Sequence, residues 1–254
     1  MARRRFYASP DDIQRSAIIL SADETHHLVH VLRMTPGNQA FVFDGCGREY
    51  KCTFRSVQRN RARLEVQDEL SDAIESPIEI TLAQALAKGE KFDFIVQKAT
   101  ELGVTSIVPL ATRYADVKLD EQQISRRVER WRRISLEALK QCGRRKLVDI
   151  SPPRTLREFL TICESSTRSS LLLFSERGGI AINDALIGMT EPSRVVALVG
   201  SEGGWSDDEL DLLNESGCKA VALGPRVLRA ETAALVAITL IQHAMGDLST
   251  GGTQ

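Results

Sequence analysis

Two short segments combine glycines with charged side chains directly after apolar, strand-like runs. The first, GSEGGWSDDE at 200–209, contains three glycines, whose lack of a Cβ lets a ligand approach the backbone closely. The second, GPRVLRAETA at 224–233, carries Arg226, Arg229 and Glu231 before a helix of small residues. Charged groups packed between a buried strand and a buried helix need partners or a chemical role, because unpaired burial is costly. The two segments are therefore candidate halves of one ligand pocket.

Each segment also has a purely structural interpretation. The first is consistent with a tight strand-to-helix turn in which Ser206 and Glu209 form a capping box. The second is consistent with an internal ion pair between Arg229 and Glu231. Two such loops at the ends of successive strands favour a shared pocket more than either loop alone. The common phosphate-binding patterns GxGxxG and GxxxxGK[ST], and the hydrolase pattern GxSxG, are absent from the expected places.

The first part of the chain consists mostly of short runs rich in aromatic and β-branched residues. Such runs, bounded by Gly, Asn or Asp, predict strands at 3–8, 39–45, 49–57 and 62–69. A helix is predicted at 22–33, with Ser21 or Asp23 as its N-cap. Several strands with a single helix predict a small β-barrel or sandwich. The polar stretch at 71–77 ends in proline and predicts a linker.

After the linker, strand-like and helix-like segments alternate, which indicates a mostly parallel sheet with helices on both faces. Ligands on such sheets bind at the carboxyl ends of the strands, and this rule directs attention to the loops after Gly200 and Leu223. The sequence predicts strands at 78–85, 106–111, 146–150, 169–176, 194–200 and 219–224. It predicts helices at 92–102, around Trp131, and at 155–160, 182–186, 207–214 and 230–245.

Composition excludes several classes of protein. The 254 residues are 43% hydrophobic and 26% charged, as is ordinary for a soluble globular protein, and no run approaches the ~18 apolar residues of a membrane span. No secretory pattern follows the basic start, so we expect a cytoplasmic protein without membrane contact. The five cysteines are scattered and never spaced as CxxC, which argues against disulfides and structural zinc. His26 and His30 have a metal-compatible spacing but no nearby cysteine or carboxylate pair, so no metal is predicted.

Local charge is more informative than the net charge of −1. Arginines open the chain and cluster again at 55–63, and a basic stretch at 126–146 holds only Glu129 and Glu137 as counter-charges. Clustered arginine is typical of a surface that binds a phosphate backbone. A solvated helix face has the same composition, and charge alone does not separate the two interpretations.

The order of motifs resembles one methyltransferase family. GSEGGW followed by LGPRVLRAETA is similar to the cofactor loops of the SPOUT superfamily of knotted methyltransferases. More narrowly, the chain resembles the RsmE family, which methylates N3 of a uridine in bacterial small-subunit (16S) ribosomal RNA. HHLVHVLRMTPGN at 26–38, KGEKFDFIVQKATELGV at 88–104 and RWRRISLEALKQCGR at 130–144 match other blocks of that family. Ser201 replaces the usual proline, which should loosen the loop by well under ~1 kcal/mol, and Ala230 replaces the usual threonine.

The resemblance implies a fold, a cofactor and partners. The fold would be a PUA-like β-barrel that grips RNA at residues 1–72, followed at 73–254 by a SPOUT-like α/β domain whose C-terminal segment forms a trefoil knot. The protein would be a homodimer. The methyl donor would be S-adenosyl-L-methionine, and the substrate small-subunit ribosomal RNA or the assembled subunit.

The resemblance also implies site residues. Arg229 and Arg144 would stabilise the deprotonated uracil, and Glu231 would act as a base or orient Arg229. The cofactor would be held by Leu198, Gly200, Glu202, Gly203, Gly204, Leu223, Gly224, Leu228 and Thr232. RNA would be contacted by Arg3, Arg5, Arg33, Lys88, Lys91 and Arg133. Two alternatives stay open: another SPOUT enzyme that modifies a ribose or a different base, and a non-catalytic RNA-binding factor of ribosome assembly.

Overall fold

The computed structural model divides the chain into two compact units. Unit 1 contains Met1–Glu75 and Leu136–Leu147, and unit 2 contains Ser76–Ser135 and Val148–Gln254. The structure describes residues 3–71, 75–87, 89–115, 120–164, 169–176, 178–186 and 194–248. The expected division at residue 72 thus lies close to the first crossing between units, but it places a segment of unit 1, Leu136–Leu147, in the second domain.

Unit 1 is built on a six-stranded sheet in the order β1-β4-β5-β6-β3-β2. The β1–β4 pair is parallel and the other pairs are antiparallel. The four predicted strands are present, while β2 and β3, of two and three residues, were not predicted. The bounds are β1 Arg5–Tyr7, β2 Ile13–Gln14, β3 Ala17–Ile19, β4 Gln39–Phe43, β5 Glu49–Gln58 and β6 Arg61–Leu70, with a short 3₁₀ turn, η1, at Pro10–Asp12.

The predicted helix at 22–33 is present at 22–31, and its hydrogen-bond pattern changes along its length. Helix α1 (Ala22–His26) is capped by Ser21, whose side chain accepts a hydrogen bond from the backbone N–H of Glu24 at 3.2 Å. A π-helical turn, η2 (His27–Val31), follows, and the N–H of Leu32 reaches back five residues to the carbonyl of His27. The helix therefore widens at its second turn, a local change that the sequence did not predict.

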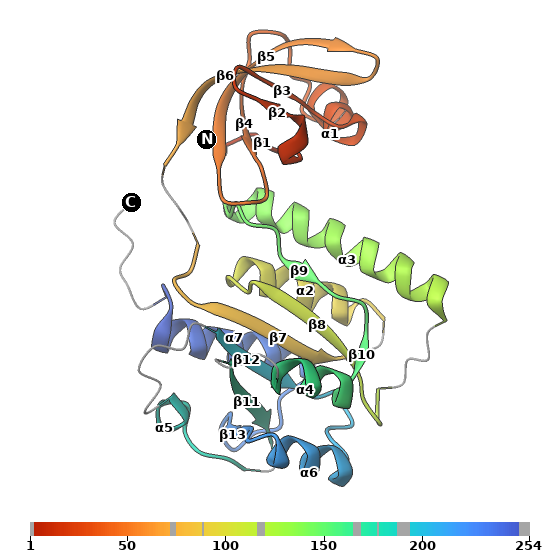
Figure 1. Cartoon of the computed structure of the whole chain (residues 1–254), viewed down its shortest axis with the longest axis vertical. Coiled ribbons are helices and arrows are strands. Elements are labelled where there is room, and N and C mark those ends of the chain that lie inside the picture. The colour runs from red at the N-terminus through yellow and green to blue at the C-terminus, as the bar shows by residue number, and fades with distance from the viewer. Residues whose placement is uncertain are drawn as a thin grey trace. The chain divides into compact units, whose positions relative to one another are not determined.

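Unit 2 is a seven-stranded sheet in which every pair is parallel, as the alternation of segments predicts (Figure 1). The order is β10-β8-β7-β12-β11-β13, with β9 also paired to β8. The strands are β7 Glu79–Ala85, β8 Ser106–Ala111, β9 Asp149–Ile150, β10 Arg154–Thr155, β11 Ser169–Ser175, β12 Arg194–Val199 and β13 Lys219–Ala222. The helices are α2 Lys91–Glu101, α3 Glu121–Cys142, α4 Leu156–Glu164, α5 Ile182–Leu186, α6 Asp207–Glu215 and α7 Ala230–Met245.

Helices cover both faces of this sheet. One hydrophobic cluster joins it to residues of α2, α3, α5 and α7, including Trp131, whose ring centre lies 4.4 Å from that of Phe92. A second cluster joins the opposite face to α4 and α6. Helix α7 buries Ala234 and Ala237, whose small side chains let it pack closely on the sheet. The predicted α/β class is confirmed, and the trefoil knot stays part of the prediction because strand order alone does not define how one loop passes another.

The strand order decides where loops meet. Strand β11 lies between β12 and β13, with Phe174 opposite Val199 and Ser175 opposite Ala222. Because all three strands are parallel, the loops that follow them leave the same edge of the sheet, side by side. The two segments singled out in the sequence are therefore neighbours on either side of a third loop, the one after β11.

Candidate active site

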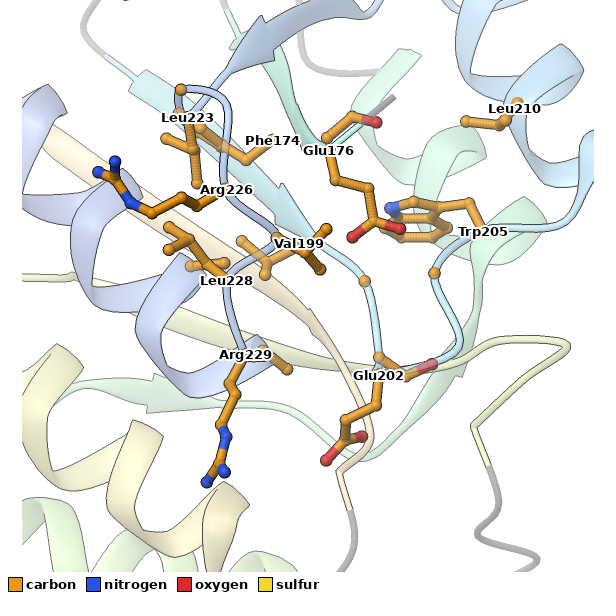
Figure 2. Close-up of a pocket in the computed structure, with 18 residues that line it drawn as sticks. Phe174, Glu176, Val199, Glu202, Trp205, Leu210, Leu223, Arg226, Leu228 and Arg229 are labelled. Atoms are coloured by element: carbon orange, nitrogen blue, oxygen red, sulfur yellow. The ribbon is translucent and has the colours of Figure 1, made fainter. Parts of the chain in front are cut away.

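A cavity of about 250 Å³ lies at the carboxyl ends of β11, β12 and β13. Its walls come from the loop after each of these strands and from the first turn of α7 (Figure 2). The lining residues are Phe174–Glu176, Val199–Glu202, Gly204, Trp205, Leu210, Leu223, Gly224, Arg226–Ala230 and Ala233. The predicted shared pocket is thus present. Besides the two predicted loops, the loop after β11 also lines it.

The glycines after β12 are required by close packing and by backbone conformation. A Cβ on Gly200 would lie 2.9 Å from Nε1 of Trp205, and a Cβ on Gly203 would lie 2.6 Å from Cβ of Tyr114. Gly204 adopts a φ of +71°, in the left-handed region that side chains rarely enter. The loop can therefore follow this path only with glycine at these positions, and its backbone is left uncovered toward the cavity.

Gln84, at the end of β7, ties this loop to the sheet. Its side chain is fully buried, and its Nε2 donates to the carbonyl oxygens of Gly200 at 3.2 Å, Val199 at 3.4 Å and Ala85 at 3.0 Å. The amide thereby holds the carbonyls at the start of the loop inside the protein. Sequence reasoning missed Gln84, although a polar residue near the carboxyl end of an otherwise apolar strand was a visible signal.

The end of the same loop is fixed by the start of α6. Ser206 accepts a hydrogen bond from the N–H of Glu209, and the Glu209 carboxylate accepts from the N–H of Ser206 at 2.9 Å, so the predicted capping box is confirmed. The other carboxylate oxygen of Glu209 accepts from the N–H of Arg113 at 2.8 Å. One glutamate thus closes the turn and joins it to the loop after β8.

Helix α7 presents charged groups at its first turn. Arg229 is the N-cap residue but makes no side-chain capping bond, and its exposed side chain lines the cavity. Oε2 of Glu231 is buried and has no hydrogen-bond partner in the part of the chain that the structure describes. No ion pair forms between these two described residues, so the structural alternative of an internal Arg229–Glu231 pair is not what the structure shows.

Lys91 and Glu202 complete a charged cluster with Arg229 and Glu231 at the edge of the cavity. The ammonium of Lys91, the first residue of α2, is hydrogen-bonded to the carboxylate of Glu202. This bond is the main reason that the pKa of Lys91 is raised above its ordinary value; the negative charge of Glu231 adds to the rise, and the positive charge of Arg229 opposes it. Lys91 therefore senses the charges of Glu202, Glu231 and Arg229.

The predicted cofactor residues are largely brought together. Gly200, Glu202, Gly204, Leu223, Gly224 and Leu228 all line the cavity. Leu198, Gly203 and Thr232 do not: Leu198 is fully buried in β12, Gly203 packs on Tyr114, and Thr232 is exposed on α7. The loop after β11, with Phe174, Ser175 and Glu176, was missed, although it also follows an apolar strand and ends in polar residues.

Arg144 is corrected from a catalytic to a structural residue. Its side chain is 5% exposed, and Nε and Nη2 donate to the same carboxylate oxygen of Glu75 at 3.0 and 2.9 Å. The other oxygen of Glu75 accepts from the backbone N–H groups of Arg145 at 2.8 Å and Lys146 at 2.9 Å. The guanidinium thus forms a buried pair with Glu75 inside unit 1, which favours a structural role over the predicted catalytic one. The sequence hid the partner because Glu75 lies 69 residues away.

Arg5 is likewise corrected from an RNA contact to a buried structural residue. Its guanidinium bonds Glu49 at 2.6 Å and donates to the carbonyl oxygens of Leu139 at 2.6 Å and Arg144 at 3.0 Å. It therefore satisfies carbonyls at and beyond the C-terminal end of α3, as a cation at a helix C-terminus does. An RNA phosphate has no access to a side chain that is only 5% exposed.

The other predicted RNA contacts have different surroundings. Arg3 is 58% exposed and lies over the ring of Phe41, 5.0 Å from its centre. Arg33 and Arg133 are exposed, and Lys91 is paired with Glu202 as described. Lys88 lies outside the described residues. Arg3, Arg33 and Arg133 thus stay available to a polyanion, whereas Lys91 belongs to the charged cluster.

Two further findings concern metals and membranes. Across the described ranges, no group of three or more His, Cys, Asp or Glu side chains is arranged to hold a metal ion. The rings of His26 and His30 lie against one another, with centres 4.9 Å apart. Within the same described ranges, no helix combines the length and the apolar character needed to cross a membrane.

Comparison with known proteins assigns both parts of the chain. The RNA methyltransferase domain family matches residues 74–242, and the RNA methyltransferase PUA domain family matches residues 20–67. A relative named ribosomal RNA small subunit methyltransferase E, from Bacillus subtilis (strain 168), is 30% identical over 88% of this chain and 89% of its own length. The chain therefore belongs to the ribosomal RNA small subunit methyltransferase E family.

Solved structures agree with this assignment. The chain superposes on ribosomal RNA small subunit methyltransferase E from Neisseria gonorrhoeae, solved bound to S-adenosyl methionine, with a TM-score of 0.87 and 33% identity over 97% of this chain and 99% of that one. A Legionella pneumophila protein in complex with the cofactor SAM gives a TM-score of 0.89, with 33% identity over 98% of this chain and 100% of that one. The similarity spans both units.

Proposed function

We propose that this chain methylates N3 of a uridine in bacterial small-subunit (16S) ribosomal RNA and uses S-adenosyl-L-methionine as the methyl donor. The observation that carries the proposal is the cavity at three strand ends with a charged cluster at its edge. An enzyme that transfers a methyl group from a nucleoside-containing cofactor to a nucleobase needs an apolar recess for the cofactor. It also needs charged groups beside the nucleobase. Both are present at the same edge of the sheet.

The residues of the cavity fit an adenosine-containing cofactor. Phe174, Val199, Leu223 and Leu228 supply apolar walls, and the glycine loop after β12 exposes backbone at close range. Ser201 Oγ and Trp205 Nε1 are polar atoms buried at this cavity, and neither has a partner among the described residues. The bound cofactor would supply an already electrophilic methyl group, so the main task of the protein is to align the acceptor.

The charged cluster is suited to activating the acceptor base. A uracil N3–H is a poor nucleophile until it loses its proton, and the resulting anion is stabilised by a nearby cation. In this proposal the exposed guanidinium of Arg229 faces the uracil oxygens. Glu231, which lies beside Arg229 in the first turn of α7, accepts the N3 proton. The ion pair between Lys91 and Glu202 joins the start of α2 to the loop after β12 at the edge of the site.

Transfer of labelled methyl groups from S-adenosyl-L-methionine to small subunits that lack the modification tests the proposal. Nucleoside mass spectrometry of the product should place the label on N3 of one uridine. Arg229→Ala should slow transfer by ~10²–10³-fold, the usual effect of removing one group that stabilises developing charge. Arg194→Ala is the matched control, because this exposed arginine pairs with Glu79 at the opposite end of β12.

Each competing function has its own outcome in this experiment. Full transfer by Arg229→Ala would remove Arg229 from the mechanism. A label on a ribose or on another base would identify a different RNA methyltransferase. The absence of both transfer and calorimetric heat with S-adenosyl-L-methionine would favour a non-catalytic assembly factor.

We further propose that the protein binds RNA partly through Arg3, Arg33 and Arg133, acts in the cytoplasm and forms a homodimer. The three arginines are exposed, as a phosphate contact requires. If they bind phosphates, affinity for the subunit should fall steeply between 50 and 200 mM salt, roughly in proportion to the number of contacts. Sedimentation equilibrium tests the dimer; a monomer at all concentrations would exclude it.

A further inference from the structure

Glu176 is an exposed residue of the cavity wall. It follows β11, which lies between β12 and β13, so its loop is the middle one of the three that form the cavity. Its Oε1 lies 3.7 Å from the position that a Cβ on Gly204 would occupy, so the carboxylate sits directly over the glycine loop. Figure 2 shows this carboxylate directed toward Trp205, whereas the guanidinium groups of Arg226 and Arg229 point away.

The carboxylate of Glu176 has no partner among the residues that the structure describes. It makes neither a hydrogen bond nor an ion pair there. Nearby walls are the apolar side chains of Phe174 and Leu210 and the indole of Trp205, whose Nε1 is also unpartnered. Glu176 is exposed, so its carboxylate is hydrated in the empty cavity, and a ligand that fills the cavity can replace this water with its own hydrogen-bond donors.

We propose that Glu176 binds the two ribose hydroxyls of the cofactor, an assignment that rests on the proposed function. A carboxylate has two oxygens and accepts one hydrogen bond from each of two adjacent hydroxyls. An acidic side chain beyond a strand end serves ribose hydroxyls in the same way in dinucleotide-binding parallel sheets. The apolar segment from Ser169 to Glu176 was predicted only as a strand, and this proposal gives its last residue a role in cofactor binding.

The amino-acid end of the cofactor is the competing ligand for Glu176. That end carries an ammonium and a carboxylate on one carbon, so a site for it needs a cation beside the acid. The cationic side chains that line the cavity, Arg226 and Arg229, point away from Glu176 in Figure 2. Arg229 also belongs to the charged cluster at the edge, which is where the reacting end of the cofactor is proposed to lie. The remaining donors are the ribose hydroxyls and the adenine amino group, and only the ribose offers two adjacent donors to the two carboxylate oxygens.

Titration calorimetry on the full chain tests the assignment without any methyl transfer. The ligands are S-adenosylhomocysteine, its 2′-deoxy form, and 5′-methylthioadenosine, which keeps the ribose but lacks the amino-acid end. Glu176→Gln should weaken S-adenosylhomocysteine and 5′-methylthioadenosine by the same factor, about 10- to 100-fold, as expected for loss of charge-assisted hydrogen bonds. Glu215→Gln is the matched control, since this glutamate is exposed at the end of α6 and does not line the cavity.

The 2′-deoxy form of S-adenosylhomocysteine tests whether Glu176 contacts the ribose 2′-hydroxyl. The wild-type chain should bind it more weakly than S-adenosylhomocysteine, whereas Glu176→Gln should bind the two with nearly equal affinity. A loss for S-adenosylhomocysteine alone would assign Glu176 to the amino-acid end and overturn the proposal, as would unchanged affinity for every ligand. Failure of the wild-type chain to bind S-adenosylhomocysteine is a separate result that would overturn the proposed function itself. Thermal unfolding of each variant checks that the fold is retained.

Discussion

Replacing Arg144 by alanine separates the role that the sequence suggests from the one that the structure shows. In the folded chain the Arg144 guanidinium donates twice to Glu75, whose side chain is only 12% exposed. Removing one member of a buried ion pair costs ~3–5 kcal/mol, because the other charge is left without compensation. Glu75 keeps two hydrogen bonds from the N–H groups of Arg145 and Lys146. The loss should therefore lie near the lower limit, ~3 kcal/mol.

For a chain of this size, ~3 kcal/mol corresponds to a melting temperature about 6–12 °C lower, measured by calorimetry. Methyl transfer by Arg144→Ala, assayed well below its melting temperature, should stay close to wild type. Adding Glu75→Gln removes the stranded charge, so the double variant should recover part of the lost stability. Glu75→Gln alone completes the cycle and gives the coupling between the two side chains.

The opposite pattern would refute this reasoning. An Arg144→Ala protein with an unchanged melting temperature and a ~10²-fold slower methyl transfer would return Arg144 to the catalytic machinery. Equal stability of Arg144→Ala with and without Glu75→Gln would show that the buried carboxylate is not the origin of the cost.

Three further predictions concern other parts of the structure. Gln84→Leu should lower the free energy of unfolding by ~1–3 kcal/mol, since it leaves buried carbonyls without a donor. It should also lower the affinity for S-adenosylhomocysteine measured by calorimetry. Thr81→Val, near the start of the same strand, should change stability but not this affinity. Ser206→Ala should cost ~1 kcal/mol in denaturant unfolding by removing the cap of α6, and no change would contradict the capping box. Burial raises the pKa of the Cys52 and Cys218 thiols to about 12. Their neutral forms therefore favour the folded state below pH 9, and this stability is lost as the pH rises from about 9 to 12. Chemical unfolding of a Cys52→Ala/Cys218→Ala variant across this range should show a weaker pH dependence of the free energy of unfolding.

The sequence by itself determined the local elements and the kind of fold. Apolar runs separated by amphipathic segments specify a parallel sheet, and the nearly uncharged segment from Ala230 to Met245 is a helix, as predicted, although it is buried along one face only. The capping box at Ser206 is equally local, because both members lie within one turn. The two glycine-containing loops could be placed at the same edge of the sheet because parallel strands all end there.

Only the tertiary structure decided which charges serve chemistry and which serve folding. Arg144 and Arg229 look alike in the sequence, but a buried carboxylate 69 residues away occupies one of them and the other stays exposed at the cavity. Glu176 became a cavity residue because β11 lies between β12 and β13, an order that chain sequence does not reveal. The physical reason is common to these cases: the effect of a charge depends on its burial and partners, and both are set by contacts between residues far apart in the chain.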